Sequence, residues 1–100
     1  MKEHIDISQV IESLRQQLQL IRQRYQVESL SVFGSYVRHE QRPDSDIDVL
    51  VTFTETPSLL KFIELENYLS DNIGVKIDLV MKDSLKSRIG RQILSEAVTI

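Results

Sequence analysis

Two aspartates, Asp46 and Asp48, stand two residues apart at the start of an apolar segment. On a β-strand this spacing points both carboxylates to the same face of the sheet. Like charges placed side by side destabilise a protein unless something positive lies between them. A divalent metal ion meets this need, and a hard cation such as Mg²⁺ takes oxygen ligands. The pair therefore predicts a metal site.

A third carboxylate, Asp78, lies between two apolar residues in the strand-like segment 75–80. An unpaired carboxylate in the interior of a strand is costly to bury. We therefore predict that Asp78 shares metal with Asp46 and Asp48 across neighbouring strands. Each aspartate taken alone has a structural alternative, as a residue at a strand start or on a half-exposed strand. Asp44, in a turn sequence, is interpreted as a turn or capping residue.

Gly34 and Ser35 lie where a short strand-like segment passes into a predicted helical turn. Glycine lets the backbone approach a ligand closely, and the start of a helix offers free N–H groups to a phosphate. Ser35 adds a hydroxyl donor, although taken alone it is most simply an N-cap. No Walker A sequence exists among the three glycines. A phosphate cradle beside a carboxylate metal site predicts phosphoryl or nucleotidyl transfer.

The helices that must position these residues follow from apolar periodicity. Helical spacing predicts one helix from Ser8, its expected N-cap, to about Tyr25. A second helix is expected from Pro57 to about Leu69, and one or two helical turns over 35–40. A final helical region is predicted from Asp83 or Ser84 to about Ala97, interrupted or bent near Gly90.

Three short segments with β-branched or aromatic residues, 29–33, 47–53 and 75–81, are predicted strands. The middle one is apolar on both faces, which favours a central position in the sheet. Turn residues occupy 41–45. The alternation of helix and strand predicts an α/β (α+β) fold, with a sheet covered by helices.

Composition bounds the function. One hundred residues, 41% of them hydrophobic and 27% charged, fit a single globular domain over 1–100. There are no cysteines to form disulfides, no apolar signal sequence and no run near the roughly 20 residues that span a bilayer. A cytoplasmic protein without membrane contact is expected. The net charge of −3 argues against direct nucleic-acid binding by phosphate neutralisation.

The spacing Gly34-Ser35, ten residues, then Asp46-x-Asp48 resembles the G-S-x10-D-x-D signature of the polymerase-β-like nucleotidyltransferase superfamily. The strings at 34–38 and 43–51 resemble those of the minimal nucleotidyltransferases of bacteria and archaea. Within that group the chain is similar to the antitoxins paired with HEPN ribonuclease toxins. The resemblance covers nearly the whole chain. It implies the polymerase-β-like nucleotidyltransferase fold, a small mixed sheet flanked by helices, as a single minimal nucleotidyltransferase domain.

The resemblance also implies roles for the site residues. Asp46 and Asp48 would bind two Mg²⁺ ions, and Asp78 would assist one of them and help to activate the attacking hydroxyl. Gly34 and Ser35 would hold the β- and γ-phosphates of ATP. The implied reaction is transfer of AMP from ATP to a hydroxyl, with release of pyrophosphate. In HEPN-linked members the acceptor is a tyrosine of the toxin, whose ribonuclease activity is thereby silenced.

Arg38 belongs to the same string and is expected among the nucleotide-binding residues, with an exposed helix arginine as the equal alternative. The chain departs from the family pattern beside it. Val37 and His39 stand where the family often has Ala and Gly. Histidine adopts positive φ less easily than glycine, so the loop is expected to be strained or reshaped. Neither departure touches a predicted metal ligand.

Three functions follow from this reading. The leading hypothesis is an antitoxin that adenylylates a HEPN-type helical toxin, because larger members of the superfamily carry a helical domain for the acceptor and this chain shows none. A second is the catalytic subunit of a two-component nucleotidyltransferase acting on a small molecule or an RNA end. The third is an antitoxin that neutralises its toxin by binding alone. The intact carboxylate set argues against the third.

Overall fold

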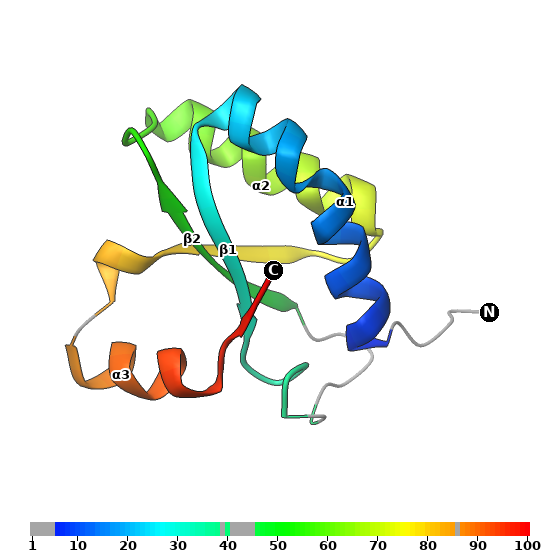
Figure 1. Cartoon of the computed structure of the whole chain (residues 1–100), viewed down its shortest axis with the longest axis vertical. Helices are drawn as coiled ribbons and strands as arrows, with labels where there is room; N and C mark the ends of the chain where they lie inside the picture. Colours follow the sequence, from blue (N-terminus) through cyan, green and yellow to red (C-terminus); the bar gives the residue numbers. More distant parts are fainter. Residues whose placement is uncertain (1–5, 39, 41–45, 86) are drawn as a thin grey trace.

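A computed structural model of the chain describes residues 6–38, 40, 46–85 and 87–100 (Figure 1). The described elements, in chain order, are α1 (Ile7–Tyr25), β1 (Val27–Phe33), β2 (Ile47–Phe53), α2 (Leu59–Ile73), β3 (Ile77–Met81), the short 3-10 helix η1 (Lys82–Ser84), α3 (Ser87–Glu96) and β4 (Val98–Thr99). The predicted turn over 41–45, with Asp44, and the departure at His39 lie outside the described residues.

The four strands form one mixed sheet in the order β3-β2-β1-β4. β1 pairs antiparallel with both β2 and β4, whereas β2 and β3 are parallel and are joined through α2. The predicted α/β class and the mixed sheet flanked by helices are confirmed. β2 has a strand on either side, which also confirms the central position expected from its apolar faces.

Two of the predicted strands differ from the structure in where they begin. β1 begins at Val27 rather than Ser29, because buried Val27 already pairs with Phe53 of β2. β3 begins at Ile77 rather than Val75. Gly74, with φ of 83°, ends α2 in the left-handed conformation, so the chain needs two further residues to become extended.

Local capping shifts the starts of the two long helices. α1 is capped by Asp6 rather than by Ser8, which lies inside the helix. The Ser8 amide donates to the Asp6 carboxylate at 3.4 Å, and the Asp6 amide donates to Gln9 Oε1 at 3.2 Å, forming a capping box. α2 begins after Ser58, whose hydroxyl accepts a hydrogen bond from the Lys61 amide at 3.2 Å.

The final helical region is divided before its predicted bend. η1 ends at Ser84 and α3 begins at Ser87, while Gly90 lies inside α3 without interrupting it. α3 ends at Glu96, and the chain then forms β4, a two-residue strand that the sequence analysis missed. So short a strand is specified by its partner β1 and shows no periodicity of its own.

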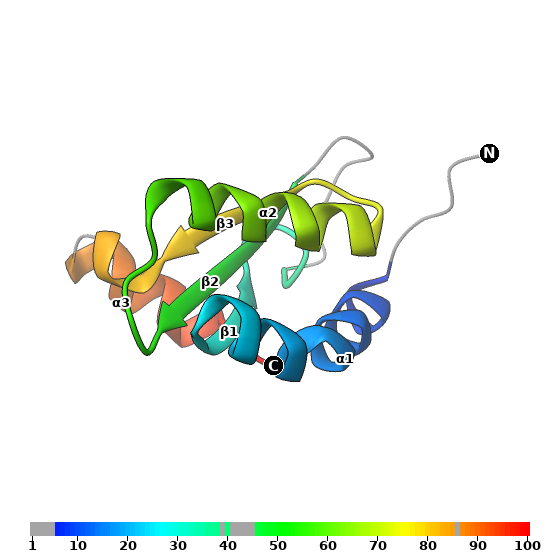
Figure 2. The ribbon, with the colours of Figure 1, turned by 90° about the horizontal axis from the view of Figure 1, so that it is seen from above.

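Helices α1 and α2 lie side by side over the sheet, and α3 lies apart from them (Figures 1 and 2). Their inward residues and those of the central strands form one apolar core. Its fully buried large side chains are Leu14, Ile21, Leu30, Ile47, Leu65, Leu69 and Ile77. This core supports β1 and β2 from one side, so that the ends of these strands are held in place.

Leu14→Ala is expected to destabilise the fold by about 2–5 kcal/mol, because Leu14 is fully buried and its removal leaves a cavity. The measurement is urea unfolding. Leu20→Ala on the same helix is the matched control, since Leu20 is 45% exposed. It should change the free energy of unfolding by less than about 1 kcal/mol. Equal losses in the two variants would contradict this assignment of the core.

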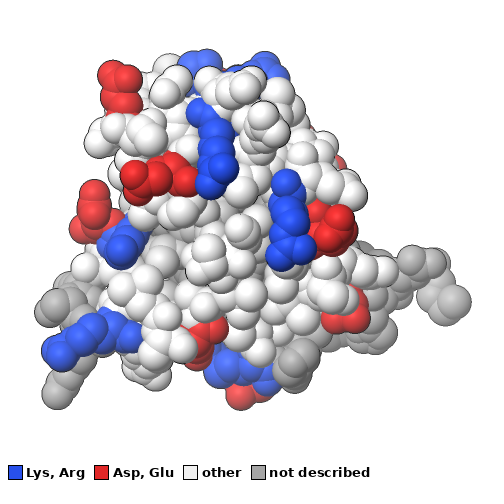
Figure 3. Space-filling view, viewed as in Figure 1, with Lys and Arg blue, Asp and Glu red and all other residues white. Residues whose placement is uncertain are grey.

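The surface in Figure 3 carries basic and acidic side chains intermixed, with wide uncharged areas between them. On this face the described residues form no continuous basic strip of the kind that follows a nucleic-acid backbone. No helix in the described ranges is long and apolar enough to cross a membrane.

Candidate active site

The predicted site residues gather at one edge of the sheet. Because β1 runs antiparallel to β2 and β2 runs parallel to β3, the end of β1 meets the starts of β2 and β3. Gly34 follows the last residue of β1, Asp48 is the second residue of β2, and Asp78 is the second residue of β3. Residues that are far apart in sequence are thus brought together by strand pairing alone.

Asp48 and Asp78 are direct partners in the parallel register of β2 and β3. Paired positions on adjacent strands point to the same face of the sheet, so the two carboxylates lie side by side. This confirms that Asp78 lies across a neighbouring strand from the Asp46-x-Asp48 pair. Asp48 is half-buried and Asp78 is exposed, so the shared face opens to solvent at Asp78.

The electrostatics of the site are concentrated on Asp48. Its pKa is raised from an ordinary value of 3.8 to about 6, first by burial and then by the negative charges of Asp78 and Asp46. A hydrogen bond with Asp78 raises the pKa further, and the positive charge of Arg38 opposes the rise. The Asp48 carboxylate therefore lies close to two other carboxylates. Such a concentration of negative charge favours a bound cation.

Gly34 is required by the position of Asp48. The backbone of Gly34 has φ of 84°, a conformation that side chains rarely adopt. A Cβ atom built there would collide with Asp48 Oδ2 and would lie 3.0 Å from Asp48 Cγ. The sequence analysis predicted a close approach of Gly34 to a ligand; in the structure the atoms beside it are those of the carboxylate.

Asp46 lies immediately before β2, and its side chain faces Lys76. Asp46 Oδ2 is 3.9 Å from Lys76 Nζ; the Lys76 side chain is exposed, whereas that of Asp46 is partly buried. Across the described parts of the chain, no group of three or more His, Asp or Glu side chains is placed to hold a metal ion. In the structure the charge of Asp46 is paired with that of Lys76. The three-carboxylate metal site therefore stays a prediction.

The turn after β1 begins at Gly34 and contains Ser35. The amides of Val37 and Arg38 both donate to the Gly34 carbonyl, at 3.1 and 3.2 Å, and the Glu40 amide donates to the Ser35 carbonyl at 2.9 Å. This is a helical turn rather than an α-helix, in line with the one or two turns expected. The first amides of such a turn take no part in its own hydrogen bonds, which leaves them available to a ligand.

Tyr36, between Ser35 and Val37, is a core residue. It is buried within the main apolar cluster. Burial, together with the negative charge of Asp46, raises the pKa of its hydroxyl. Tyr36 thereby anchors the turn that carries Ser35 to the body of the domain.

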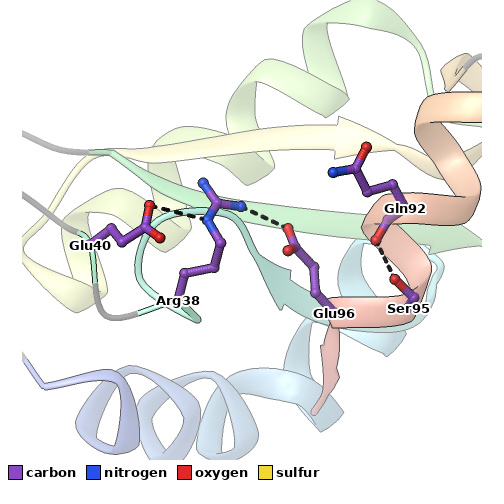
Figure 4. A network of polar contacts seen from close by, with 5 residues as sticks. All are labelled: Arg38, Glu40, Gln92, Ser95 and Glu96. Atoms are coloured by element: carbon purple, nitrogen blue, oxygen red, sulfur yellow. Dashed lines mark hydrogen bonds and ion pairs between the residues drawn. The ribbon is translucent and has the colours of Figure 1, made fainter.

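Arg38 lies at the end of this turn between two carboxylates (Figure 4). Its Nη1 donates to Glu96 Oε1 at 3.0 Å, and its Nε donates to Glu40 Oε2 at 3.5 Å. The sequence analysis did not single out Glu96. In the sequence, Glu96 is an ordinary acidic residue at the end of the predicted last helix. The pairing of β4 with β1 brings this part of the chain next to the turn.

The fold and this edge of the sheet, with two paired carboxylates beside a Gly-Ser turn, define a small nucleotidyltransferase domain. Residues 14–100 match the nucleotidyltransferase domain family. The chain belongs to this family and is a nucleotidyltransferase.

Similar proteins place the chain within that family. It is 56% identical to the protein adenylyltransferase MntA of Thermococcus cleftensis, over 80% of this chain and 81% of the relative. A solved structure assigned as a minimal nucleotidyltransferase is 33% identical, with a TM-score of 0.81 over 99% of this chain and all of that one. These two comparisons confirm the resemblance to the minimal nucleotidyltransferases.

A more distant structure shares the fold. It is that of a tri-AMPylated HEPN toxin of Shewanella oneidensis in complex with its MNT antitoxin. The match has a TM-score of 0.66 at 21% identity, over 90% of this chain and 70% of that one.

Proposed function

We propose that this nucleotidyltransferase is an antitoxin that transfers AMP from ATP to a tyrosine hydroxyl of a HEPN-type toxin. The single observation that carries the proposal is the direct pairing of Asp48 with Asp78 beside the Gly34 turn. It combines an acidic cluster with backbone amides that can receive a phosphate. The relative from Thermococcus cleftensis, named a protein adenylyltransferase, supports a protein as the acceptor.

The residues present fit bound Mg²⁺. Asp48 and Asp78 offer hard oxygen ligands on one face of the sheet. The pKa of Asp48 is raised first by burial and then by the charges of Asp78 and Asp46, so a bound cation would favour its ionised form. Asp46 adjoins them and would join the ligand set by leaving Lys76. When bound, Mg²⁺ neutralises charge on the phosphates and on the entering and leaving oxygens.

The chain's own residues would bind and orient the substrates. The backbone of Gly34 and the hydroxyl of Ser35 would hold the β- and γ-phosphates of ATP, and Arg38 would pair with phosphate charge. The acceptor oxygen attacks the α-phosphorus, the bond from that phosphorus to the bridging oxygen breaks, and pyrophosphate leaves. Asp78, the more exposed carboxylate, would receive the proton of the acceptor hydroxyl.

The partner proposed is a helical HEPN toxin. In the complex from Shewanella oneidensis, an antitoxin of this fold is bound to a HEPN toxin that carries three AMP groups. The exposure of Asp78 is consistent with an acceptor that arrives from outside the domain. Attachment of AMP adds a charged phosphodiester to a tyrosine, which removes its hydroxyl donor and alters its surroundings.

Labelled ATP tests this function. The chain and the candidate toxin are incubated with Mg²⁺ and ATP carrying label on either the α- or the γ-phosphate. We expect label on the partner from α-labelled ATP only, because pyrophosphate leaves with the γ-phosphate. Omission of Mg²⁺ should lower the transfer by at least about 100-fold.

The control is the Asp46→Asn/Asp48→Asn variant, which keeps the shape of the site and removes two negative charges. Equal transfer by this variant would contradict the catalytic role. Transfer of label to RNA or to a small molecule instead would favour a two-component nucleotidyltransferase. A toxin that is silenced without any label would show neutralisation by binding alone.

A further inference from the structure

The ion pair between Arg38 and Glu96 joins two distant parts of the chain at the candidate site. The two residues are 58 positions apart, and Arg38 Nη1 lies 3.0 Å from Glu96 Oε1. The Glu96 side chain is 25% exposed, whereas that of Glu40, the other partner of Arg38, is 64% exposed and lies 3.5 Å away. Glu96 is therefore the closer and the better shielded of the two partners (Figure 4).

Both ends of this ion pair are attached to β1. Arg38 follows β1 through the Gly34 turn. Glu96 is the last residue of α3, two residues before β4, which pairs with β1 through Thr99 opposite Ser31. Just beyond β4, the Ile100 amide donates to the Leu30 carbonyl at 2.9 Å. The Glu96 carboxylate is thus held in a defined position relative to the strand that leads into the site.

Without Glu96, the Arg38 guanidinium could pair with other carboxylates of the site. Its charge already acts on Asp48, and Asp78 lies beside Asp48. A long, half-exposed arginine side chain has about 2 kcal/mol of rotamer entropy to lose on being fixed. A guanidinium attracted onto Asp48 would occupy the space where a cation or phosphate must bind. Holding it at the edge of the site avoids this competition.

The pairing leaves part of the guanidinium for a ligand. Arginine has five N–H donors in a rigid planar fork, and the contacts with Glu96 and Glu40 use two of its nitrogens, Nη1 and Nε. A phosphate is the anion that matches the remaining donors. We propose that Glu96 is a positioning residue for the nucleotide, holding the Arg38 guanidinium at the edge of the site to contact a phosphate of ATP. The inference rests on the proposed function.

Binding of AMP-PNP in the presence of Mg²⁺ tests this inference without any acceptor. Glu96→Gln removes the charge of the carboxylate and keeps its size. We expect the Kd for AMP-PNP, and the KM for ATP during transfer, to rise about 5- to 20-fold, the size of one misplaced charge-assisted contact. The kcat should fall by less than about 3-fold, because the carboxylates that act on the reacting atoms are untouched.

Glu12→Gln is the matched control, because Glu12 also pairs with an arginine, Arg15 at 3.7 Å, in an exposed ion pair on the surface of α1 that includes none of the proposed site residues. Its Kd should stay within about twofold of the wild-type value. Glu96→Asp keeps the charge and should recover most of the lost affinity. In an Arg38→Gln background, Glu96→Gln should have no further effect on Kd, since Glu96 acts through Arg38.

An unchanged Kd in Glu96→Gln would overturn the inference, even with a lower melting temperature, because the role would then be structural. An equal further loss in the Arg38→Gln background would overturn it as well. If Glu96→Gln does not fold, the Kd for AMP-PNP is measured in Glu96→Asp and in Arg38→Gln instead. A wild-type Kd in Arg38→Gln would then reject the inference. A wild-type chain that binds AMP-PNP but labels no partner contradicts the proposed function alone.

Discussion

Gly34→Ala is expected to lower AMP transfer by at least about 100-fold while the domain stays folded. An alanine Cβ would collide with Asp48 Oδ2, and the Asp48 side chain would have to rotate away from its place beside Asp78. Misplacing a catalytic group by about 1 Å costs on the order of 100-fold in rate, so we expect at least that loss in kcat. The measurement is transfer of labelled AMP at saturating ATP.

Gly74→Ala is the control for Gly34→Ala. It carries the same cost of a left-handed alanine backbone without the collision with Asp48. Gly74 has nearly the same φ, 83°, but no atom lies within 4 Å of the position of an added Cβ. Both variants should lose about 1–2 kcal/mol of stability, because alanine is strained in the left-handed region. Only Gly34→Ala should lose activity. Retention of more than half of the wild-type activity in Gly34→Ala would show that the contact with Asp48 is dispensable.

Asp48→Asn is expected to lose transfer activity by about 1000-fold and, in the absence of divalent metal, to gain stability. The activity falls because a proposed metal ligand has lost its charge. The gain in stability follows from the pKa of Asp48, which the fold raises from 3.8 to about 6. A raised carboxyl pKa means that the folded state favours the protonated form, and that ionisation of Asp48 opposes folding.

The sign of this effect sets a pH window. Between pH 3.8 and about 6 the Asp48 carboxyl binds more protons in the folded than in the unfolded chain, so the contribution of Asp48 to stability falls as pH rises. Above this window the wild type carries the full penalty, about 1–2 kcal/mol after allowance for solvent screening. The uncharged asparagine side chain of the variant carries none. Urea unfolding of both proteins at pH 4 and pH 8 measures the difference.

Asp71→Asn, the same chemical change on an exposed position of α2, is the control. It should change stability by less than about 0.5 kcal/mol and leave transfer unchanged. Addition of Mg²⁺ should stabilise the wild type more than Asp48→Asn, because a ligand bound to the folded state adds to its stability. A variant that is less stable than the wild type at pH 8 would contradict this account of the site.

The placement of the carboxylates could be predicted because strand geometry leaves few choices. The aspartates at the start of one apolar strand, and the polar Asp78 within another, already indicated adjacent strands that bring carboxylates together, as they do for Asp48 and Asp78; Asp46 lies just before β2 and pairs with Lys76. The central position of β2 followed from its apolar residues, and the Gly-Ser turn from its place after a strand. Each of these features is recorded in a short stretch of sequence, where periodicity and residue type are informative.

Contacts between distant segments could not be predicted in the same way. The collision partner of Gly34 depends on the register of β1 with β2, and the partner of Arg38 depends on β4, which is too short to show a pattern. The N-cap at Asp6 was missed because Ser8 is an equally good cap in isolation, and the capping box with Gln9 decides between them.

The pairing of β4 with β1 has a consequence for how the domain forms during synthesis. In a sheet of β1, β2 and β3 formed before residues 98–99 were available, β1 would be an edge strand with unpaired backbone groups open to other chains. Arg38 is synthesised 58 residues before Glu96, so the turn that carries Arg38 leaves the ribosome before its partner does. The ion pair between Arg38 and Glu96 therefore depends on residues that are synthesised after those of the acidic site.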